Sequence, residues 1–164
     1  LQNNLFKLFL CDTGLLCAAS MGNIQFDILS GDLSVNMGSI LENVFAQNLK
    51  SNGFELHYFD SKKIGELDFV LQNGLSTELV EIKSGNDFMK HTAIDNAMKV
   101  DNWNFKKCIV FSKSNLERKG DILYLPWYMI IFYRQQELTG QMIYQVDLSG
   151  LLTDSLTGIL KDNN

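Results

Sequence analysis

The sequence has 164 residues, of which 46% are hydrophobic, 11% aromatic and 20% charged. This length suits one domain that buries about two thirds of its unfolded surface, and the composition excludes an intrinsically disordered chain. The net charge of -5 argues against a protein that binds nucleic acid through a generally basic surface, because phosphate contacts come from Lys and Arg.

Residues 1–36 are expected to form an N-terminal strand and loop extension. Residues 5–10 have a strand-like apolar pattern, and 15–21 follow a turn at Asp12-Thr13-Gly14 as a short predicted helix. Residues 22–36 are rich in Gly, Ser, Asn and Asp and are predicted to be a loop. Because Leu1 is followed almost at once by the strand pattern, we expect the chain to be a fragment of a longer protein, with a module missing upstream.

Residues 37–136 are expected to form the core of the domain. Apolar residues at helical spacing predict a helix that begins at Met37 and ends at Asn52-Gly53. Alternating patterns then predict three strands, near 55–60, 66–72 and 77–83, the last two joined by a hairpin at Asn73-Gly74. A second helix is predicted over about 86–103, followed by strands over 108–111 and 122–125 and a helix from Pro126 to about Gln136. The order helix, three strands, helix, strand predicts an α/β domain with a central mixed sheet.

Residues 137–164 are expected to form a C-terminal amphipathic tail. Its apolar positions suggest a segment that packs on the domain or on a partner, which would be another protein or a second copy of the chain: Val146, Leu148, Leu151, Leu152, Leu156 and Ile159.

Cysteine usage and hydropathy indicate a cytoplasmic protein without a membrane partner. Cys11, Cys17 and Cys108 lack the paired spacings of a zinc site or a disulfide framework, and we expect buried thiols in a reducing compartment. The longest apolar stretch, 122–133, is too short to span a bilayer and contains Pro126.

Two acids and a lysine on neighbouring strands are the leading candidates for chemistry. Side chains alternate across a strand, so Glu81 and Lys83 share a face. A hairpin that pairs Gln72 with Thr77 places Asp68 opposite Glu81, and a tighter loop places Asp68 opposite Leu79 with Glu81 on the diagonal. Both registers predict that Asp68 and Glu81 lie together.

Facing carboxylates repel each other unless a proton or a cation lies between them. A Mg²⁺ ion held by one or two carboxylates, water and a substrate phosphate fits such a pair. Lys83 would then orient an attacking water or stabilise negative charge on the phosphate. The alternative is an ion cluster in which Lys83 only neutralises the two acids.

These residues resemble the PD-(D/E)XK nuclease superfamily, which has a restriction-endonuclease-like three-layer α/β/α core. The resemblance rests on Glu42 in the first helix, Asp68 on the second strand, Glu81-Ile82-Lys83 on the third, and the order of elements. Four segments look more closely like the domain of unknown function that follows the ATPase module in prokaryotic AAA-type ATPases: Lys7-Leu8-Phe9-Leu10-Cys11-Asp12-Thr13-Gly14-Leu15-Leu16, Leu41-Glu42-Asn43, Glu66-Leu67-Asp68-Phe69-Val70 and Val80-Glu81-Ile82-Lys83-Ser84-Gly85.

The resemblance implies a DNA nuclease that uses Mg²⁺ or Mn²⁺. It assigns Asp68, Glu81 and the Ile82 carbonyl as metal ligands, Lys83 as the catalytic lysine and Glu42 as the accessory helix acid. Leu67 stands where the superfamily has a proline, and no Gln-x-x-x-Tyr follows in the second helix. The ATP-binding motif G-x-x-x-x-G-K-[ST] is absent from the sequence, so ATP would be bound by the missing ATPase module. The alternative function is a non-catalytic module that binds protein or nucleic acid and regulates that ATPase.

Glu42 and the basic residues each allow two interpretations. Ser39-x-x-Glu42 is also a capping-box pattern, which would give Glu42 a role at the helix start. Half of the 14 basic residues lie between Lys90 and Lys119, and they form either a solvated surface or a patch that leads DNA toward the acidic site.

Overall fold

The computed structural model describes residues 6–20, 30, 37–103, 105 and 107–136. Within them, helix α1 (Thr13–Ser20) precedes helix α3 (Met37–Ser51), and three strands follow: β1 (His57–Ser61), β2 (Gly65–Asn73) and β3 (Ser76–Ile82). Helix α4 (Thr92–Ala97) leads to β4 (Lys107–Ser112), β5 (Glu117–Lys119), β6 (Ile122–Pro126) and the 3₁₀ helix η1 (Trp127–Phe132).

The strands form a six-stranded mixed sheet in the order β1-β2-β3-β4-β6-β5. The pairs β1·β2, β2·β3 and β5·β6 are antiparallel, whereas β3·β4 and β4·β6 are parallel. The hairpin between β2 and β3 pairs Gln72 with Thr77, which is the first of the two expected registers. Gly74 in its turn has φ +61°, a conformation that glycine adopts without strain.

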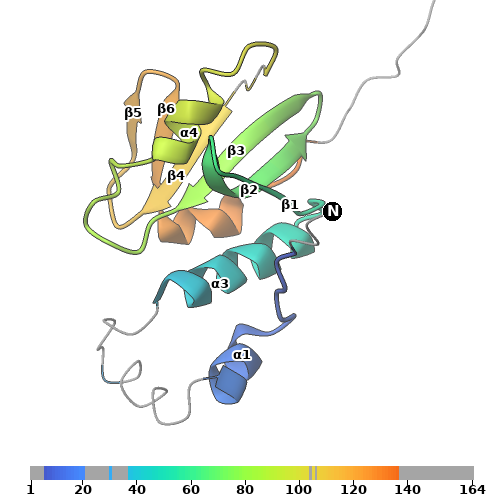
Figure 1. Ribbon diagram of the computed structural model, residues 1–164. Helices are drawn as coiled ribbons and strands as arrows, with labels where there is room; N and C mark the ends of the chain where they lie inside the picture. Colours follow the sequence, from blue (N-terminus) through green and yellow to red (C-terminus); the bar gives the residue numbers. More distant parts are fainter. Residues whose placement is uncertain (1–5, 21–29, 31–36, 104, 106, 137–164) are drawn as a thin grey trace, which may run out of the picture.

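Helices lie on both faces of this sheet (Figure 1). One apolar core contains residues of α3 and η1 with Phe69, Val80 and Phe111 of the sheet. The other contains Ile94 and Ala97 of α4 with sheet residues that include Leu79 and Val110. Alternating side chains of β3 and β4 thus supply both cores, which explains why these strands are almost continuously apolar.

The structure confirms the helix over 37–51, the three strands after it and the strands near 108–112 and 122–125. Strand β5 was not predicted, because its exposed sequence Glu117–Lys119 has no apolar alternation. The predicted loop over 22–36, apart from Ser30, and the predicted tail over 137–164 lie outside the described residues.

The predicted strand over 5–10 is wrong for the described residues 6–10, which form no regular structure. The backbone N–H and C=O of Leu10 bond to the side chain of Asn43 on α3, at 2.8 and 3.1 Å, instead of to a strand. The helix that follows agrees with the prediction, and Asp12 caps it by accepting a hydrogen bond from Leu15 N at 2.7 Å.

The second predicted helix is much shorter than 86–103, because α4 has only six residues. Its start is fixed at His91, whose ring bonds to Asp95 (3.0 Å) and to Tyr124 of β6 (2.7 Å). After α4, Asn102 has φ +72°, which is incompatible with a continuing right-handed helix. The last predicted helix is a 3₁₀ helix that ends at Phe132.

Cysteine exposure differs from the expectation, since Cys11 is exposed and Cys17 half-buried, whereas Cys108 is buried. Burial raises the pKa of the Cys108 thiol to about 11. In the part of the chain that the structure describes, no helix has the length and apolar character to cross a membrane.

Candidate functional site

A bulge in β2 shapes the surroundings of Asp68. His57 of β1 pairs with Val70 and Phe59 pairs with Leu67, so one extra residue of β2 lies between these two pairs. The bulge interrupts the regular alternation: Leu67 belongs to the core beside α4, whereas Phe69 belongs to the core beside α3. Bulges often redirect side chains next to functional sites, and the regular alternation assumed from the sequence does not hold here.

Asp68 lies where the β2·β3 ladder ends. The last backbone pair is Phe69 with Val80, and the next residues along the two strands are Asp68 and Glu81. Beyond this pair, a hydrogen bond from backbone to side chain joins the two strands: Ile82 N–H donates to Asp68 Oδ2 at 2.8 Å. Its carboxylate is thereby fixed at the point where the two strands part.

The pKa of Asp68 is raised from its usual 3.8 to about 6, and burial is the largest cause. The negative charges of Glu42 and Glu81 act in the same direction as burial, while the hydrogen bond from Ile82 and the charge of Lys7 act against it. The pKa of Asp68 is thus affected both by Glu42 of α3 and by Glu81 of β3. Asp68 therefore connects two groups of charged side chains, which are called the two ion groups below.

The first ion group gathers three acids around one ammonium. Lys7 Nζ lies 2.6 Å from Glu66 Oε1, 3.2 Å from Glu42 Oε2 and 3.7 Å from Asp68 Oδ1. Burial alone would lower the pKa of Lys7, but the hydrogen bond to Glu66 and the charges of Glu42 and Asp68 raise it above its usual value. Lys7 therefore stays charged at neutral pH.

The second ion group is Glu81 with Lys83, whose Nζ lies 2.5 Å from Glu81 Oε1. Glu81 is buried, and its Oε2 has no hydrogen-bond partner among the described residues. A buried acceptor without a partner costs about 1–3 kcal/mol, so this oxygen marks a position that favours a cation. Lys83 itself is held by its backbone, which donates to Phe111 O at 2.8 Å and accepts from Trp127 Nε1 at 3.1 Å.

The net negative charge of the two ion groups equals the charge of one divalent cation. The acids Glu42, Glu66, Asp68 and Glu81 exceed the lysines Lys7 and Lys83 by two negative charges when all six are ionised. In the described part of the chain, no three His, Cys, Asp or Glu side chains are arranged as ligands of one ion. Mg²⁺ is commonly bound by only one or two carboxylates, with waters and phosphate oxygens as the other ligands, and Asp68 with Glu81 meets that requirement.

Glu42 takes part in the ion group and not in a helix cap. Helix α3 begins at Met37, two residues before Ser39, so Ser39 is inside the helix. The Glu42 carboxylate accepts a hydrogen bond from Lys7. Of the two interpretations of Glu42, this geometry favours the site.

Two residues of the predicted basic patch, Lys107 and Lys113, lie at opposite ends of β4. Lys113 follows β4 at the end near Lys83, and its Nζ lies 5.5 Å from the ring of Trp127. Lys107 begins β4 beside Glu78, at the other end of β3. Only Lys113 of these two is near the acids, because parallel strands place their carboxyl ends at one edge.

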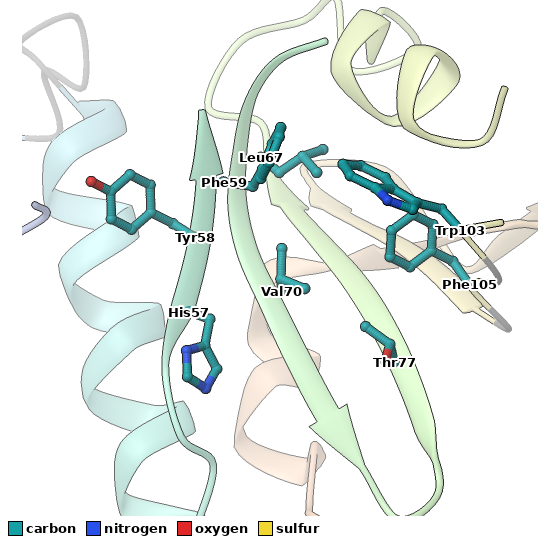
Figure 2. A pocket seen from close by; sticks show the side chains of 8 residues that line it. All are labelled: His57, Tyr58, Phe59, Leu67, Val70, Thr77, Trp103 and Phe105. Carbon is teal, nitrogen blue, oxygen red and sulfur yellow. The ribbon is translucent and has the colours of Figure 1, made fainter. Parts of the chain in front are cut away.

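An apolar cavity of about 360 Å³ lies on the sheet face away from α3, over β1, β2 and β3. Figure 2 shows Trp103 and Phe105 standing over Leu67, Val70 and Phe59, whereas Tyr58 points to the opposite side of β1. The ring of Trp103 meets that of Phe59 edge-on with centroids 5.2 Å apart. This cavity is separate from the ion groups.

Lys7 and Glu66 are the members of the site that were not assigned a role from the sequence. Both lie in segments that carry the family resemblance, but neither belongs to the nuclease motif. Lys7 reaches Glu66 because the N-terminal segment packs against α3. The periodicity of strands and helices gives no information about such a long-range contact.

Residues 37–130 match the model of a domain of unknown function, DUF4143. No curated protein matches the chain, and no solved structure does. The match covers more than half of the chain and includes Glu42, Asp68, Glu81 and Lys83. The chain therefore belongs to the DUF4143 family.

Proposed function

We propose that this DUF4143 domain is a phosphodiesterase that hydrolyses DNA with Mg²⁺ or Mn²⁺. The observation that carries the proposal is the buried Oε2 of Glu81, which has no hydrogen-bond partner in the described part of the chain, while Lys83 pairs with the other Glu81 oxygen. Asp68 lies on the adjacent strand, directly after the last backbone pair of β2 and β3. We also infer that the sheet with α3 and α4 is a restriction-endonuclease-like three-layer core. The sheet order and the helices on both faces support that inference.

Asp68, Glu81 and the Ile82 carbonyl are the groups that would hold the ion. When bound, the ion would supply positive charge beside the phosphate and a water of lowered pKa. Lys83 would stabilise the negative charge that accumulates on the phosphate oxygens. In the reaction, the water oxygen bonds to phosphorus and loses a proton to solvent; the P–O ester bond breaks, and the leaving oxygen keeps the electron pair and takes up a proton.

We further infer that the domain is part of a larger prokaryotic AAA-type ATPase in the cytoplasm. The support is the resemblance of the segments at Lys7, Leu41, Glu66 and Val80. ATP hydrolysis in the other module would then bring DNA to the site or control access to it.

The test is a cleavage assay with single- and double-stranded DNA in the presence of Mg²⁺ or Mn²⁺. We expect cleavage by the parent chain, loss of at least tenfold in Glu81→Gln, and no loss in Glu55→Gln. Glu55 is exposed and pairs with Lys50 at the other end of α3, so this control removes one acid away from the site. Equal activity of the parent and Glu81→Gln, or no cleavage together with no metal binding, would overturn the proposal.

A second candidate is a non-catalytic binding module that regulates the ATPase. The observation that favours it is the cavity under Trp103, an aromatic-lined hollow of the kind on which nucleic acid bases stack. If this candidate is right, a single-stranded oligonucleotide will bind without divalent metal and quench the tryptophan fluorescence. Trp103→Phe will remove the quenching, and Asp68→Asn will not change it.

A further inference from the structure

Two lysines and a tryptophan lie at the carboxyl ends of three adjacent strands. Strands β3, β4 and β6 are neighbours in the sheet and run in the same direction. They end directly before Lys83, Lys113 and Trp127, respectively. The carboxyl ends of parallel strands meet at one edge of the sheet, and open α/β sheets bind their ligands outside that edge.

The indole of Trp127 holds the backbone of Lys83. Its Nε1–H donates to the carbonyl oxygen of Lys83 at 3.1 Å, and the backbone N–H of Lys83 donates to Phe111 O at 2.8 Å. Both backbone polar groups of Lys83 are therefore bonded, although β3 itself ends at Ile82. The side chain of Lys83 thus extends from a fixed backbone toward Glu81, whose Oε1 lies 2.5 Å from Lys83 Nζ.

The ring of the same tryptophan lies beside Lys113. The distance from Lys113 Nζ to the ring centroid of Trp127 is 5.5 Å, at which the face of an aromatic ring attracts an ammonium. Trp127 is half-buried and packs on the apolar core beside α3, which fixes the orientation of its ring. Lys113 is exposed and forms no salt bridge with any residue that the structure describes. Its ammonium is therefore available to a phosphate.

We propose that Trp127 is a positioning residue of the candidate active site, because it fixes Lys83 and Lys113 at the same edge of the sheet. This inference rests on the proposed function. Lys83 meets the phosphate that is cleaved, and Lys113, which follows the strand on the far side of β3 from Asp68, binds a neighbouring phosphate of the DNA. Trp127 itself needs no contact with DNA, since it acts through the two lysines.

The experiment compares Trp127→Phe, which removes the indole N–H but keeps an aromatic ring, with Trp127→Leu, which removes both. Cleavage kinetics, Mn²⁺ binding by calorimetry and the salt dependence of DNA affinity are measured for each chain. Trp127→Phe should lower kcat by about tenfold to 10²-fold, the usual effect of a small displacement of a catalytic group, without changing KM. Trp127→Leu should in addition raise KM and reduce the salt dependence by about one counter-ion. Both variants should bind Mn²⁺ as the parent does, because the metal ligands are unchanged.

Double variants distinguish positioning from a general loss of structure. Trp127→Phe should not lower kcat further when Lys83→Ala is already present, because the indole acts on the chemistry only through Lys83. In the same way, Trp127→Leu should not weaken DNA binding further in Lys113→Gln. Phe132→Leu is the matched control, since Phe132 is 65% exposed on the same 3₁₀ helix, and it should leave all three measurements unchanged.

The outcomes separate this inference from the proposed function. If the parent cleaves DNA and Trp127→Phe has the same kcat, or if the effects in the double variants add, the role of Trp127 is overturned and the phosphodiesterase proposal stands. If the parent binds no metal and cleaves no DNA, the phosphodiesterase proposal is contradicted and the salt dependence decides the inference. A smaller dependence in Trp127→Leu alone then supports the role of Trp127, whereas equal dependence in all chains, or no DNA binding by the parent, overturns it. If Trp127→Leu does not fold, Trp127→Met is measured instead, since it keeps apolar bulk without a ring.

Discussion

Ile82 and Asp68 are joined across two strands by a hydrogen bond from backbone to side chain, with Ile82 N donating to Asp68 Oδ2 at 2.8 Å. The carboxylate takes the position in which a neighbouring strand would offer a carbonyl. The bond favours the ionised carboxylate, whereas burial and the acids Glu42 and Glu81 disfavour it, and the balance raises the pKa of Asp68 to about 6. Without metal, Asp68 is therefore poised to bind a proton.

The raised pKa of Asp68 predicts that the contribution of this group to the free energy of unfolding decreases as the pH rises. Between its usual pKa of 3.8 and about 6, the folded chain binds more protons at this position than the unfolded chain, so the free energy of unfolding falls with pH across this window. The loss from this group is at most roughly 3 kcal/mol. It should disappear in Asp68→Asn.

The measurement is thermal unfolding in EDTA between pH 4 and pH 7.5. The difference in melting temperature between Asp68→Asn and the parent should grow in favour of the variant toward neutral pH. Asp60→Asn is the control, since Asp60 is exposed on β1. A constant difference across the range would contradict the raised pKa.

Binding of a divalent metal ion should offset the loss of stability that the ionised Asp68 causes near neutral pH. Millimolar Mg²⁺ or Mn²⁺ at pH 7.5 should raise the melting temperature of the parent, because an ion that binds only the folded state stabilises it. Asp68→Asn and Glu81→Gln should each abolish the increase, since each removes a charged ligand, while Glu55→Gln should keep it. An equal metal-induced increase in all four chains would show that the ion binds elsewhere.

The sequence predicted the placement of Asp68, Glu81 and Lys83 on neighbouring strands because period-2 alternation and the Asn73-Gly74 turn determine the hairpin. It did not predict the bulge of β2, which depends on pairing with β1, nor the position of Lys7, which depends on Asn43. Helix α4 is shorter than its apolar periodicity suggested, because the contacts of His91 with Asp95 and Tyr124 fix its start. Local patterns thus predicted the elements, and long-range contacts completed the site.

Substitution of Lys83 is expected to affect DNA cleavage but not metal binding. Lys83→Ala should bind Mn²⁺ as well as the parent or better, because the ligands remain and Glu81 loses a competing cation. The same variant should lose cleavage by about 10²-fold or more, the usual cost of removing one group that stabilises transition-state charge. Calorimetry and the cleavage assay measure the two effects. Parallel loss of both would show that Lys83 supports only the structure of the site.

The division of the basic residues predicts unequal effects on DNA binding. Lys113→Gln should weaken binding and reduce its dependence on salt by about one counter-ion, because Lys113 lies beside Trp127 near Lys83. Lys107→Gln should leave both unchanged, since Lys107 is at the other end of β3. Fluorescence anisotropy over a series of salt concentrations tests this pair. Equal effects would mean that DNA does not approach from the Lys113 side.

The opposite end of the sheet provides a prediction about stability alone. Tyr133 is buried and its hydroxyl donates to Glu78 Oε2, and burial together with Glu78 raises the pKa of Tyr133 well above its usual range. Asn73 Nδ2 donates to the other Glu78 oxygen at 3.3 Å. Because Glu78 is itself buried, Tyr133→Phe leaves a carboxylate oxygen without its donor and should lower the free energy of unfolding by about 1–3 kcal/mol.

Tyr128→Phe is the matched control, since Tyr128 is 67% exposed, and it should change the free energy of unfolding by less than about 0.5 kcal/mol. Urea unfolding measures both variants, and Mn²⁺ binding should be the same in each, because Glu78 is three residues before Glu81 at the other end of β3. A Tyr133→Phe chain as stable as the parent would mean that water or another group satisfies Glu78 once the hydroxyl is removed.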